Sequence, residues 1–274
     1  MADRAPKRLA DVLVLCYHAV SADWPLPMSV SPAQLERDVK LLLGRGYRSA
    51  TFHDAVFAPP ARRTFAVTFD DAFGSVFERA YPLLSELGVP ATVFVPSDHT
   101  ESGAPRAWPR LDRWLGTEHE HELAGMSWAE LRELQRAGWE IGSHTSSHPR
   151  LTGLPARELR YELTASRLRC EERIGVSCRT LAYPYGDVDG RVAEAARLAG
   201  YAAAASLDQW TRRPDPMRWP RTVVVKATSE RFAADTSAVR RWAKGSRVGP
   251  ALRPLARRAR ALAAPGRVSR RRSP

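Results

Sequence analysis

Short β-forming runs alternate with helical segments along most of this chain, and that alternation restricts the fold more than any other feature. Runs such as 12–16 and 65–69 are almost continuously apolar, which is typical of parallel strands buried on both faces. The other predicted strands cover residues 47–51, 91–95, 139–142, 179–183, 201–205 and 222–226. This pattern predicts a parallel α/β architecture, either an open sheet or a barrel.

Helix-start signals separate these runs. Ser31 and Pro32 give an N-cap and a proline at the first helical position, and Gln34 stands where a capping-box partner is expected. Ser127 and Glu130 repeat the capping box before a second helix. Further helices are predicted at 156–174 and 192–198, each followed by a glycine. Residues 97–125 mix polar residues, prolines and tryptophans and are predicted to form a long loop.

The excess positive charge is confined to the C-terminal part of the chain. The net charge is +12, but the last acidic residue is Asp235, and the twelve Arg and Lys residues after it leave 30 basic and 30 acidic residues in 1–235. A neutral body with a basic tail is unlike a nucleic-acid groove, so nucleic acid is disfavoured as a partner. We expect one domain at 9–244 and a flexible basic tail at 245–274.

The tail itself leaves two interpretations open. Apolar residues recur in it at helical spacing among the arginines, at Leu252, Leu255, Ala259 and Leu262. This short amphipathic stretch is compatible with attachment to an anionic membrane surface, but a solvated appendage that has no partner is the simpler interpretation.

Neither an export signal nor a membrane span is evident in the sequence. The apolar run near the start, 12–16, is shorter than the ~7–15 residues of a signal segment. Three cysteines without a C-x-x-C spacing, Cys16, Cys170 and Cys178, are typical of buried, reduced thiols. These features predict a cytoplasmic protein, with the tail as the candidate for peripheral membrane attachment.

Reactive side chains follow the predicted strands at their carboxyl ends. His18 comes after the first strand, the pair Asp70 and Asp71 after 65–69, His144 after 139–142 and Tyr185 after 179–183. In parallel α/β folds this edge of the sheet carries the active site. Adjacent carboxylates repel each other, so both ionise most easily if one meets a cation.

Two histidines and a carboxylate suggest a metal site. His144 and His148 have the H-x3-H spacing that can place two imidazoles on one ion. Together with one aspartate they would leave a position open for water, whose pKa a divalent ion lowers towards ~7. The simpler alternatives are a helix cap at the aspartate pair and unrelated surface histidines. A divalent metal, with Zn²⁺ favoured by these ligands, would suit hydrolysis of an amide or ester.

Three segments resemble the motifs of the polysaccharide deacetylases, a family of carbohydrate esterases. Thr68-Phe69-Asp70-Asp71 is similar to the first motif, His144-Thr145-Ser146-Ser147-His148 to the second, and Tyr183-Pro184-Tyr185-Gly186 to the later half of the third. The resemblance covers about residues 12–226. It implies a distorted (β/α) barrel with about seven parallel strands, followed here by the basic tail.

The resemblance also implies roles for these residues. Asp70 would be the general base, Asp71, His144 and His148 the metal ligands, and the backbone N–H of Tyr185 a donor to the oxyanion. Pro184 is a secondary candidate for binding substrate. Trp108 and Trp114, in the predicted long loop, are candidates for stacking on a sugar ring or for ordinary packing.

The chain departs from the family pattern at three points. Ala72 replaces a glycine after the first motif, and Ala182 replaces the arginine that supports the base. Arg221 or Arg218 could supply a guanidinium instead. The usual acid histidine near the C-terminus is missing as well, because no histidine follows His148.

His18 offers a replacement for that acid. A Tyr-His step after the first strand, Tyr17-His18, resembles the rearranged subgroup that includes the poly-N-acetylglucosamine deacetylases. The resemblance thus implies a hydrolase of non-peptide carbon–nitrogen bonds that removes N-acetyl groups from an acetylated glycan. An O-acetyl esterase, a non-sugar amidohydrolase and a non-catalytic binding protein with a relict site are the alternatives.

Overall fold

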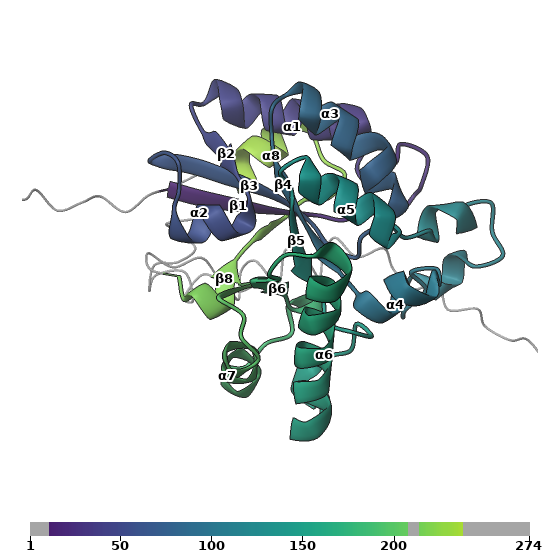
Figure 1. Ribbon diagram of the computed structural model, residues 1–274. Coiled ribbons are helices and arrows are strands. Elements are labelled where there is room, and N and C mark those ends of the chain that lie inside the picture. Colours follow the sequence, from purple (N-terminus) through teal and green to yellow (C-terminus); the bar gives the residue numbers. More distant parts are fainter. Residues whose placement is uncertain (1–10, 208–213, 238–274) are drawn as a thin grey trace, which may run out of the picture.

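Parallel strands form the centre of the molecule, as Figure 1 shows for the computed structural model, which describes residues 11–207 and 214–237. Within these residues the strands are β1 (Asp11–Tyr17), β2 (Arg48–Ala50), β3 (Arg63–Phe69), β4 (Ala91–Val95), β5 (Glu140–Ser143), β6 (Thr180–Ala182), β7 (Ala203–Ser206), β8 (Trp219–Pro220) and β9 (Thr222–Val223). The predicted strand at 91–95 is reproduced to the residue, and the other predicted strands overlap observed ones.

The strands follow one continuous path, β8-β7-β6-β5-β4-β3-β1-β9, and every pairing along it is parallel. β2 lies off this path and pairs with the first half of β3, while β4 pairs with its second half. β8 and β9 lie at opposite ends of the path but are consecutive in the chain, with only Arg221 between them. The chain itself therefore closes the barrel at Arg221.

The expected distorted α/β barrel is confirmed, with eight strands around the path rather than about seven. The predicted run 222–226 forms a strand only at Thr222–Val223, and a further strand, Trp219–Pro220, precedes it. The two are so short because Arg221 interrupts them while the chain switches from β7 to β1.

Side chains on the two faces of the strands enter different cores. Leu13 and Leu15 pack outward with the helices, whereas Val12 and Val14 pack inward with residues such as Phe94. The interior is tight, because a Cβ atom at Gly142 would lie 2.7 Å from the Phe94 ring. Continuous apolar runs were needed to fill both cores, which is why the strands were recognisable from sequence.

Most helices cover the outside of the sheet (Figure 1), whereas Phe52 and Ala55 of the helix Phe52–Phe57 pack into the inner core with Phe94. The helices are α1 (Pro32–Gly44), α2 (Phe52–Phe57), α3 (Tyr81–Glu86), α4 (Ser97–Ser102), α5 (Trp128–Arg136), α6 (Ala156–Ile174), α7 (Gly190–Leu198) and α8 (Ser229–Asp235), and a π-helical turn, Val76–Ala80, precedes α3. The Ser127–Glu130 capping box is confirmed. At α1 the Ser31 side chain caps Gln34 N, but the Gln34 side chain binds Val225 O instead of closing a box.

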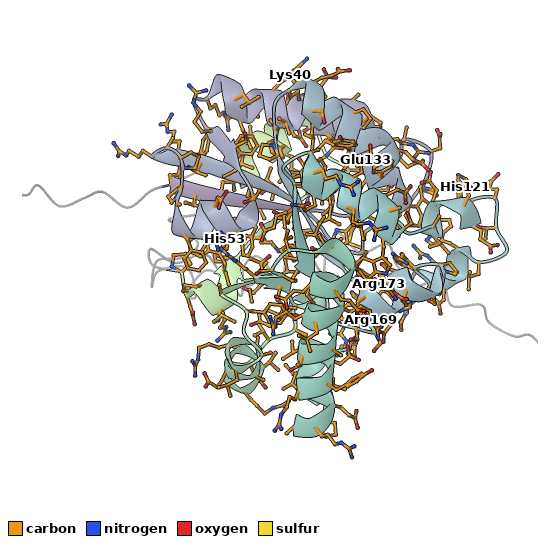
Figure 2. All side chains as sticks on the ribbon, viewed as in Figure 1. Lys40, His53, His121, Glu133, Arg169 and Arg173 are labelled. Carbon is orange, nitrogen blue, oxygen red and sulfur yellow. The ribbon has the colours of Figure 1, made fainter. Side chains whose placement is uncertain are left out.

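The segment 97–125 is not the unstructured loop that its composition predicted. It begins with α4 and contains two 3-10 turns, Asp112–Trp114 and Glu120–Leu123. Ion pairs from Arg169 and Arg173 of α6 to Asp98 and Glu101 hold α4 in place, and Figure 2 shows the two arginines along α6. These contacts join distant parts of the chain, so the local sequence did not reveal them.

The remaining expectations concern the membrane, the cysteines and the tail. Among the described residues no helix combines the length and the apolar character that a membrane crossing requires. All three cysteines are buried and free of disulfides, as predicted. The tail at 245–274 lies outside the described residues.

Candidate active site

The reactive residues predicted at the strand ends meet at one rim of the barrel. They border a cavity of about 660 Å³, and the lining residues include His18, Asp70, Asp71, His144, His148 and Tyr185. Pro184 is buried and does not line this cavity, and Arg221 lies behind Asp70. The topology thus brings together residues that are up to 167 positions apart in the sequence, from His18 to Tyr185.

Asp71, His144 and His148 have the spacing of ligands around a common ion. The Nε2 atoms of both histidines lie 3.4 Å from Asp71 Oδ1. Two ligand atoms each ~2.0–2.1 Å from a tetrahedral Zn²⁺ lie about 3.3–3.4 Å apart. Asp71 Oδ1 is buried and has no hydrogen-bond donor among the described residues. These residues therefore fit the divalent ion that the sequence motifs imply.

The histidines are oriented for ligation. The Nδ1–H of His144 donates to Ala182 O over 2.8 Å, and such a bond fixes the tautomer that leaves Nε2 unprotonated. Burial lowers the pKa of His148 to about 3, despite the nearby Asp71 carboxylate. At His144 the carboxylates of Asp70 and Asp71 outweigh the effect of burial and raise the pKa, so a metal ion that binds both neutral imidazoles would displace a proton there.

Glu162 of α6 shapes the loop that carries the two histidines. Its Oε2 accepts hydrogen bonds from the backbone N–H groups of Ser146 and Ser147 at 2.9 and 3.0 Å. The loop needs this support because Thr145 and His148 have positive φ angles of 67° and 61°, a region that L residues rarely adopt. Sequence reasoning missed Glu162, since nothing in the helical pattern of 156–174 sets it apart.

Arg106 holds the main chain at Asp71, the third candidate ligand. Its Nε donates to Asp71 O over 2.9 Å, and its Nη2 donates to Thr100 Oγ1 over 3.0 Å. Asp71 and Ala72 have φ angles of 71° and 51°, so this is a left-handed turn in which the family's usual glycine is replaced. Arg106 is 1% exposed and was not singled out in the sequence.

Arg221 forms an ion pair with Asp70, the neighbour of Asp71 in the sequence. Nη1 and Nη2 donate to Oδ1 and Oδ2 over 2.6 and 2.8 Å, and Nη1 also donates to Thr68 Oγ1. Burial alone would raise the pKa of Asp70, but the Arg221 guanidinium holds it well below its usual range. The guanidinium that is missing at Ala182 is therefore supplied from the junction between β8 and β9.

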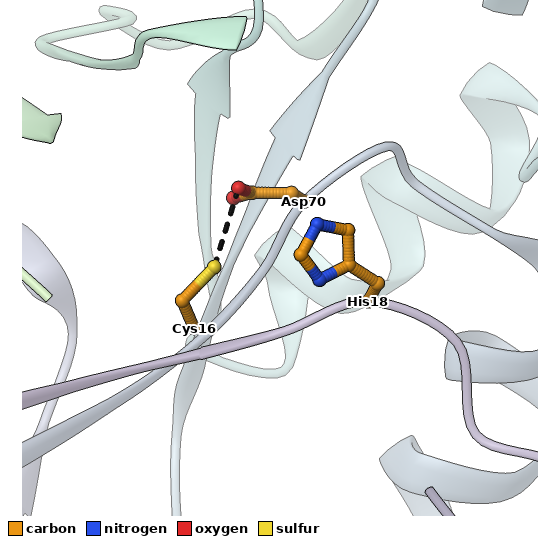
Figure 3. Close-up of side chains that lie close together, drawn as sticks. All are labelled: Cys16, His18 and Asp70. Atoms are coloured by element: carbon orange, nitrogen blue, oxygen red, sulfur yellow. Dashed lines mark hydrogen bonds between the residues drawn. The ribbon is translucent and has the colours of Figure 1, made fainter. Parts of the chain in front are cut away.

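Cys16 and His18 approach Asp70 from the end of β1 (Figure 3). The Cys16 thiol donates to Asp70 Oδ2 over 3.4 Å, and the His18 ring lies beside the same carboxylate. Burial raises the pKa of the Cys16 thiol, which favours the protonated, donating form. Sequence reasoning treated Cys16 only as a buried apolar residue. The alternation of β1, which puts residues 16 and 18 on one face, was the missed signal.

Tyr185 lines the cavity and has a left-handed backbone conformation, with φ of 60°. No acceptor for its N–H is found in the part of the chain that the structure describes. The next residue, Gly186, has φ of 68°, and a Cβ there would lie 2.7 Å from Leu207. The tight turn thus leaves one backbone donor available at the rim.

Of the two tryptophan candidates for stacking on sugar, one lies at the cavity. Trp108 lines it and stacks on the His148 ring at a centroid distance of 4.1 Å. Trp114 instead packs edge-on against Trp24 at 6.0 Å and serves the core.

Comparison with known proteins gives a family and a fold. A family model described as polysaccharide deacetylase matches residues 58–204, more than half of the chain. A Bacillus subtilis (strain 168) protein called YxkH is 26% identical over 212 residues, which cover 73% of this chain and 68% of that protein.

A second relative is the poly-beta-1,6-N-acetyl-D-glucosamine N-deacetylase of Staphylococcus aureus (strain MSSA476). It is 25% identical over 200 residues, which cover 68% of this chain and 64% of that enzyme. The chain therefore spans less than two thirds of its length. Among solved structures, the Streptococcus pyogenes deacetylase PplD in complex with acetate superposes with a TM-score of 0.71 at 19% identity. The superposition covers 83% of this chain and 98% of that one, and it shows a shared fold.

Proposed function

Since this chain belongs to the polysaccharide deacetylase family, we propose that it removes N-acetyl groups from amino sugars, such as N-acetylglucosamine, in a polysaccharide or glycan precursor. The products are acetate and a free amine. One observation carries the proposal: Asp71 Oδ1 lies 3.4 Å from two imidazole nitrogens, beside a second carboxylate that is paired with an arginine.

The three ligand residues would be Asp71, His144 and His148, and we infer Zn²⁺ as the ion. When bound, such an ion supplies Lewis acidity, which polarises the acetyl carbonyl and lowers the pKa of water. The chain's own residues then have to orient the substrate, accept one proton and deliver another.

Asp70 would accept the proton of the attacking water. Arg221 holds both of its oxygens and keeps it ionised, so the carboxylate is ready to accept a proton and is fixed in direction. As the water oxygen bonds to the acetyl carbon, negative charge develops on the carbonyl oxygen. The backbone N–H of Tyr185 is the donor that would stabilise this oxyanion.

His18 would donate the proton that the leaving nitrogen needs. An amide does not expel an amide anion, so the C–N bond breaks only as its nitrogen is protonated. His18 borders the same cavity as Asp70 and is only half-buried. An activated ester with a good leaving group needs no such acid, so its hydrolysis separates this role of His18 from a role in binding or structure.

Acetate release measured on matched glycans tests the proposal. The purified chain, with Zn²⁺ added after chelator treatment, is expected to release acetate from N-acetylglucosamine oligosaccharides. It should release less from O-acetylated oligosaccharides without amino sugars. The Asp71→Asn variant is the background control. Acetate from the O-acetylated set alone would identify an esterase, and acetate from neither would contradict deacetylation of glycans.

His18 has a sharper test of its own. His18→Ala is expected to lower amide hydrolysis by about 10²–10⁴-fold, the scale of a lost general acid, and to lower hydrolysis of an activated acetate ester much less. Metal content should be unchanged. Equal losses on both substrates would make His18 a substrate-binding or structural residue.

The domain limits 9–244, the cytoplasmic location and the role of the tail stay predictions. A chain ending at Gly245 should release acetate from a small substrate at an unchanged rate. It should bind vesicles containing anionic phospholipid more weakly than the full chain, since Lys and Arg contribute about 1 kcal/mol each near such a surface. Equal vesicle binding by both chains would exclude membrane attachment through the tail.

A further inference from the structure

A second cavity lies against the catalytic one. Its volume is about 310 Å³, and it shares the side chains of Trp108, His148 and Tyr185 with the larger cavity. The remaining walls are Pro109, Arg110, Ser147, Pro149 and Arg150. The second cavity is therefore a lobe of the active site, next to the metal-ligand histidine His148.

Two arginines are the charged residues of this lobe, and no carboxylate lines it. Arg110 comes from the segment 97–125 and Arg150 from the loop after the second motif, so the fold brings them together from separate places. Within the described ranges 11–207 and 214–237, neither guanidinium has an acidic partner within ion-pair distance. By contrast, Arg169, Arg173 and Arg221 are all paired with carboxylates.

Aromatic rings lie between this lobe and the part of the main cavity in which the acetamide group would react. The Arg150 guanidinium lies 4.4 Å from the centroid of the Tyr185 ring, and that ring lies 4.7 Å from the His148 ring. Trp108 stacks on His148 as well. A glycan whose acetamide group reaches Asp70 would thus extend a neighbouring substituent, on the same sugar or the next one, towards the lobe that both arginines line.

We propose that Arg110 and Arg150 form a subsite for an oxyanion, a carboxylate or a phosphate, which the substrate carries next to its acetamido sugar. This inference rests on the proposed deacetylation, because it concerns the same cavity. Guanidinium groups bind carboxylate and phosphate through paired N–H donors. The substrate is then an anionic glycan, such as a uronate-containing polysaccharide or a sugar phosphate, rather than a neutral one.

The catalytic carboxylates do not cancel this positive field. Asp70 is neutralised by Arg221, and Asp71 faces the two histidines and would be neutralised by the metal ion. Arg113 adds a third positive charge at the edge of the main cavity, where it stacks on Trp114. The rim is therefore positive as a whole, which favours the encounter with an anionic chain at low salt.

Three substrates test the proposal: neutral N-acetylglucosamine oligosaccharides, oligosaccharides alternating N-acetylglucosamine with glucuronate, and N-acetylglucosamine 1-phosphate. We expect kcat/KM to be higher for at least one anionic substrate than for the neutral one. The double variant Arg110→Gln/Arg150→Gln should lower the ratio of kcat/KM for the anionic substrate to kcat/KM for the neutral one. The expected decrease is on the order of 10²-fold, about tenfold for each charge-assisted contact. The preferred anion decides between uronate and phosphate.

Matched controls separate the subsite from net charge. Arg136→Gln/Arg160→Gln removes two exposed charges from α5 and α6 that line neither cavity, and it should leave the ratio unchanged. Arg110→Lys/Arg150→Lys keeps the charge but loses the paired donors, and it should give an intermediate ratio. A ratio that falls equally in the control pair, or in neither pair, overturns the subsite.

Binding measurements keep this test independent of turnover. Calorimetric titration of the same substrates into the Asp70→Asn variant, with and without Arg110→Gln/Arg150→Gln, should show that the arginines strengthen binding of the anionic substrate selectively. If no substrate releases acetate but this selectivity is present, the proposed reaction fails and the subsite stands. If acetate is released and neutral and anionic substrates bind alike in both backgrounds, the subsite fails and the reaction stands.

Discussion

Two buried arginines serve two neighbouring aspartates, and they do so in different ways. Arg221, from the junction of β8 and β9, binds the side chain of Asp70. Arg106, from the segment 97–125, binds the main chain of Asp71. Both guanidiniums are at least nine-tenths buried, so the difference lies in what each one contacts.

The contrast shows in the charge state of each arginine. The Asp70 carboxylate raises the pKa of Arg221 against the opposing effect of burial. Arg106 has carbonyl and hydroxyl oxygens as hydrogen-bond acceptors, and burial lowers its pKa to about 10. Arg221 therefore balances a charge, whereas Arg106 holds a backbone shape.

This difference supports the different roles that we propose for the two adjacent aspartates. Both oxygens of Asp70 are occupied by a cation, which suits a fixed, ionised base. Oδ1 of Asp71 has no hydrogen-bond donor, because Arg106 donates to the main-chain carbonyl of Asp71 and not to its carboxylate. An oxygen that is buried and unpaired is costly unless a ligand reaches it, which supports Asp71 as the proposed metal ligand.

The largest effect is expected from substitution of Asp71, which tests its assignment as the metal ligand of the aspartate pair. Asp71→Asn should abolish stoichiometric metal binding and reduce acetate release to background, because a neutral amide replaces the anionic ligand. His144→Ala and His148→Ala should do the same. Metal content after dialysis is the measurement, with circular dichroism to check the fold. Full metal occupancy in all three variants would show that these residues are not the ligands.

Asp70→Asn should differ from Asp71→Asn in its metal content. The variant should retain its metal but lose turnover by at least ~10²-fold, the scale of a lost general base. Metal content and kcat measured on one preparation give the comparison with Asp71→Asn directly. Turnover close to that of the unmodified chain would place the base elsewhere in the cavity.

Arg221→Gln should lower turnover and shift its pH dependence. Without the guanidinium, burial raises the pKa of Asp70. The carboxyl is then protonated at a higher pH, and the acid limb of the kcat/KM profile moves upward. Removing one partner of a buried pair also costs about 3–5 kcal/mol of folding stability, so Arg221→Lys serves as the better-folded variant, with a smaller shift. An unmoved acid limb in both variants would show that Arg221 does not set the ionisation of Asp70.

Substitution of Arg106 is expected to change metal affinity and to leave the acid limb of the kcat/KM profile where it is. Arg106→Gln should weaken metal affinity and lower the melting temperature. Gly125→Ala should do likewise, because its Cβ would lie 1.9 Å from the Arg106 guanidinium carbon. Gly44→Ala is the matched control, since nothing lies within 4 Å of the Cβ position there. A metal affinity that is unaffected by Gly125→Ala would remove Arg106 from the support of Asp71.

Sequence alone located the strand ends, because buried parallel strands need apolar runs and reactive residues follow them. It also indicated Arg221, since the absence of an arginine at Ala182 directed attention to other guanidiniums. Arg106 and Glu162 could not be found in this way. Both act through hydrogen bonds to backbone groups of a distant segment, and a backbone contact imposes no spacing or motif on the sequence.

Arg110 and Arg150 escaped notice for a related reason. Each is an isolated exposed arginine in a chain with 42 basic residues, and only the fold shows that they line the same lobe. Cys16 differs, because its position two residues before His18 on β1 contained the signal. Contacts that follow strand periodicity are therefore predictable here, whereas those that depend on how loops meet are not.

The smallest expected effect concerns Ala72, which shares the left-handed turn with Asp71. Alanine with φ of 51° costs about 1–2 kcal/mol relative to glycine. Ala72→Gly would relieve that cost, but it loses a buried methyl group worth about 0.8 kcal/mol and adds entropy to the unfolded chain, at about 0.4–1 kcal/mol. These terms nearly cancel, so we expect little change in melting temperature or metal affinity from Ala72→Gly alone.

In the Arg106→Gln background the same substitution should matter more. If Arg106 acts by holding the turn, glycine at position 72 lets the turn form with less help, and Ala72→Gly should recover part of the lost metal affinity. Isothermal titration of Zn²⁺ into the unsubstituted chain, the two single variants and the double variant gives the coupling. Additive effects would mean that Arg106 acts on Asp71 through its charge, as Arg221 acts on Asp70. The two arginines would then differ in geometry only, and the unpaired Asp71 oxygen would need another cause.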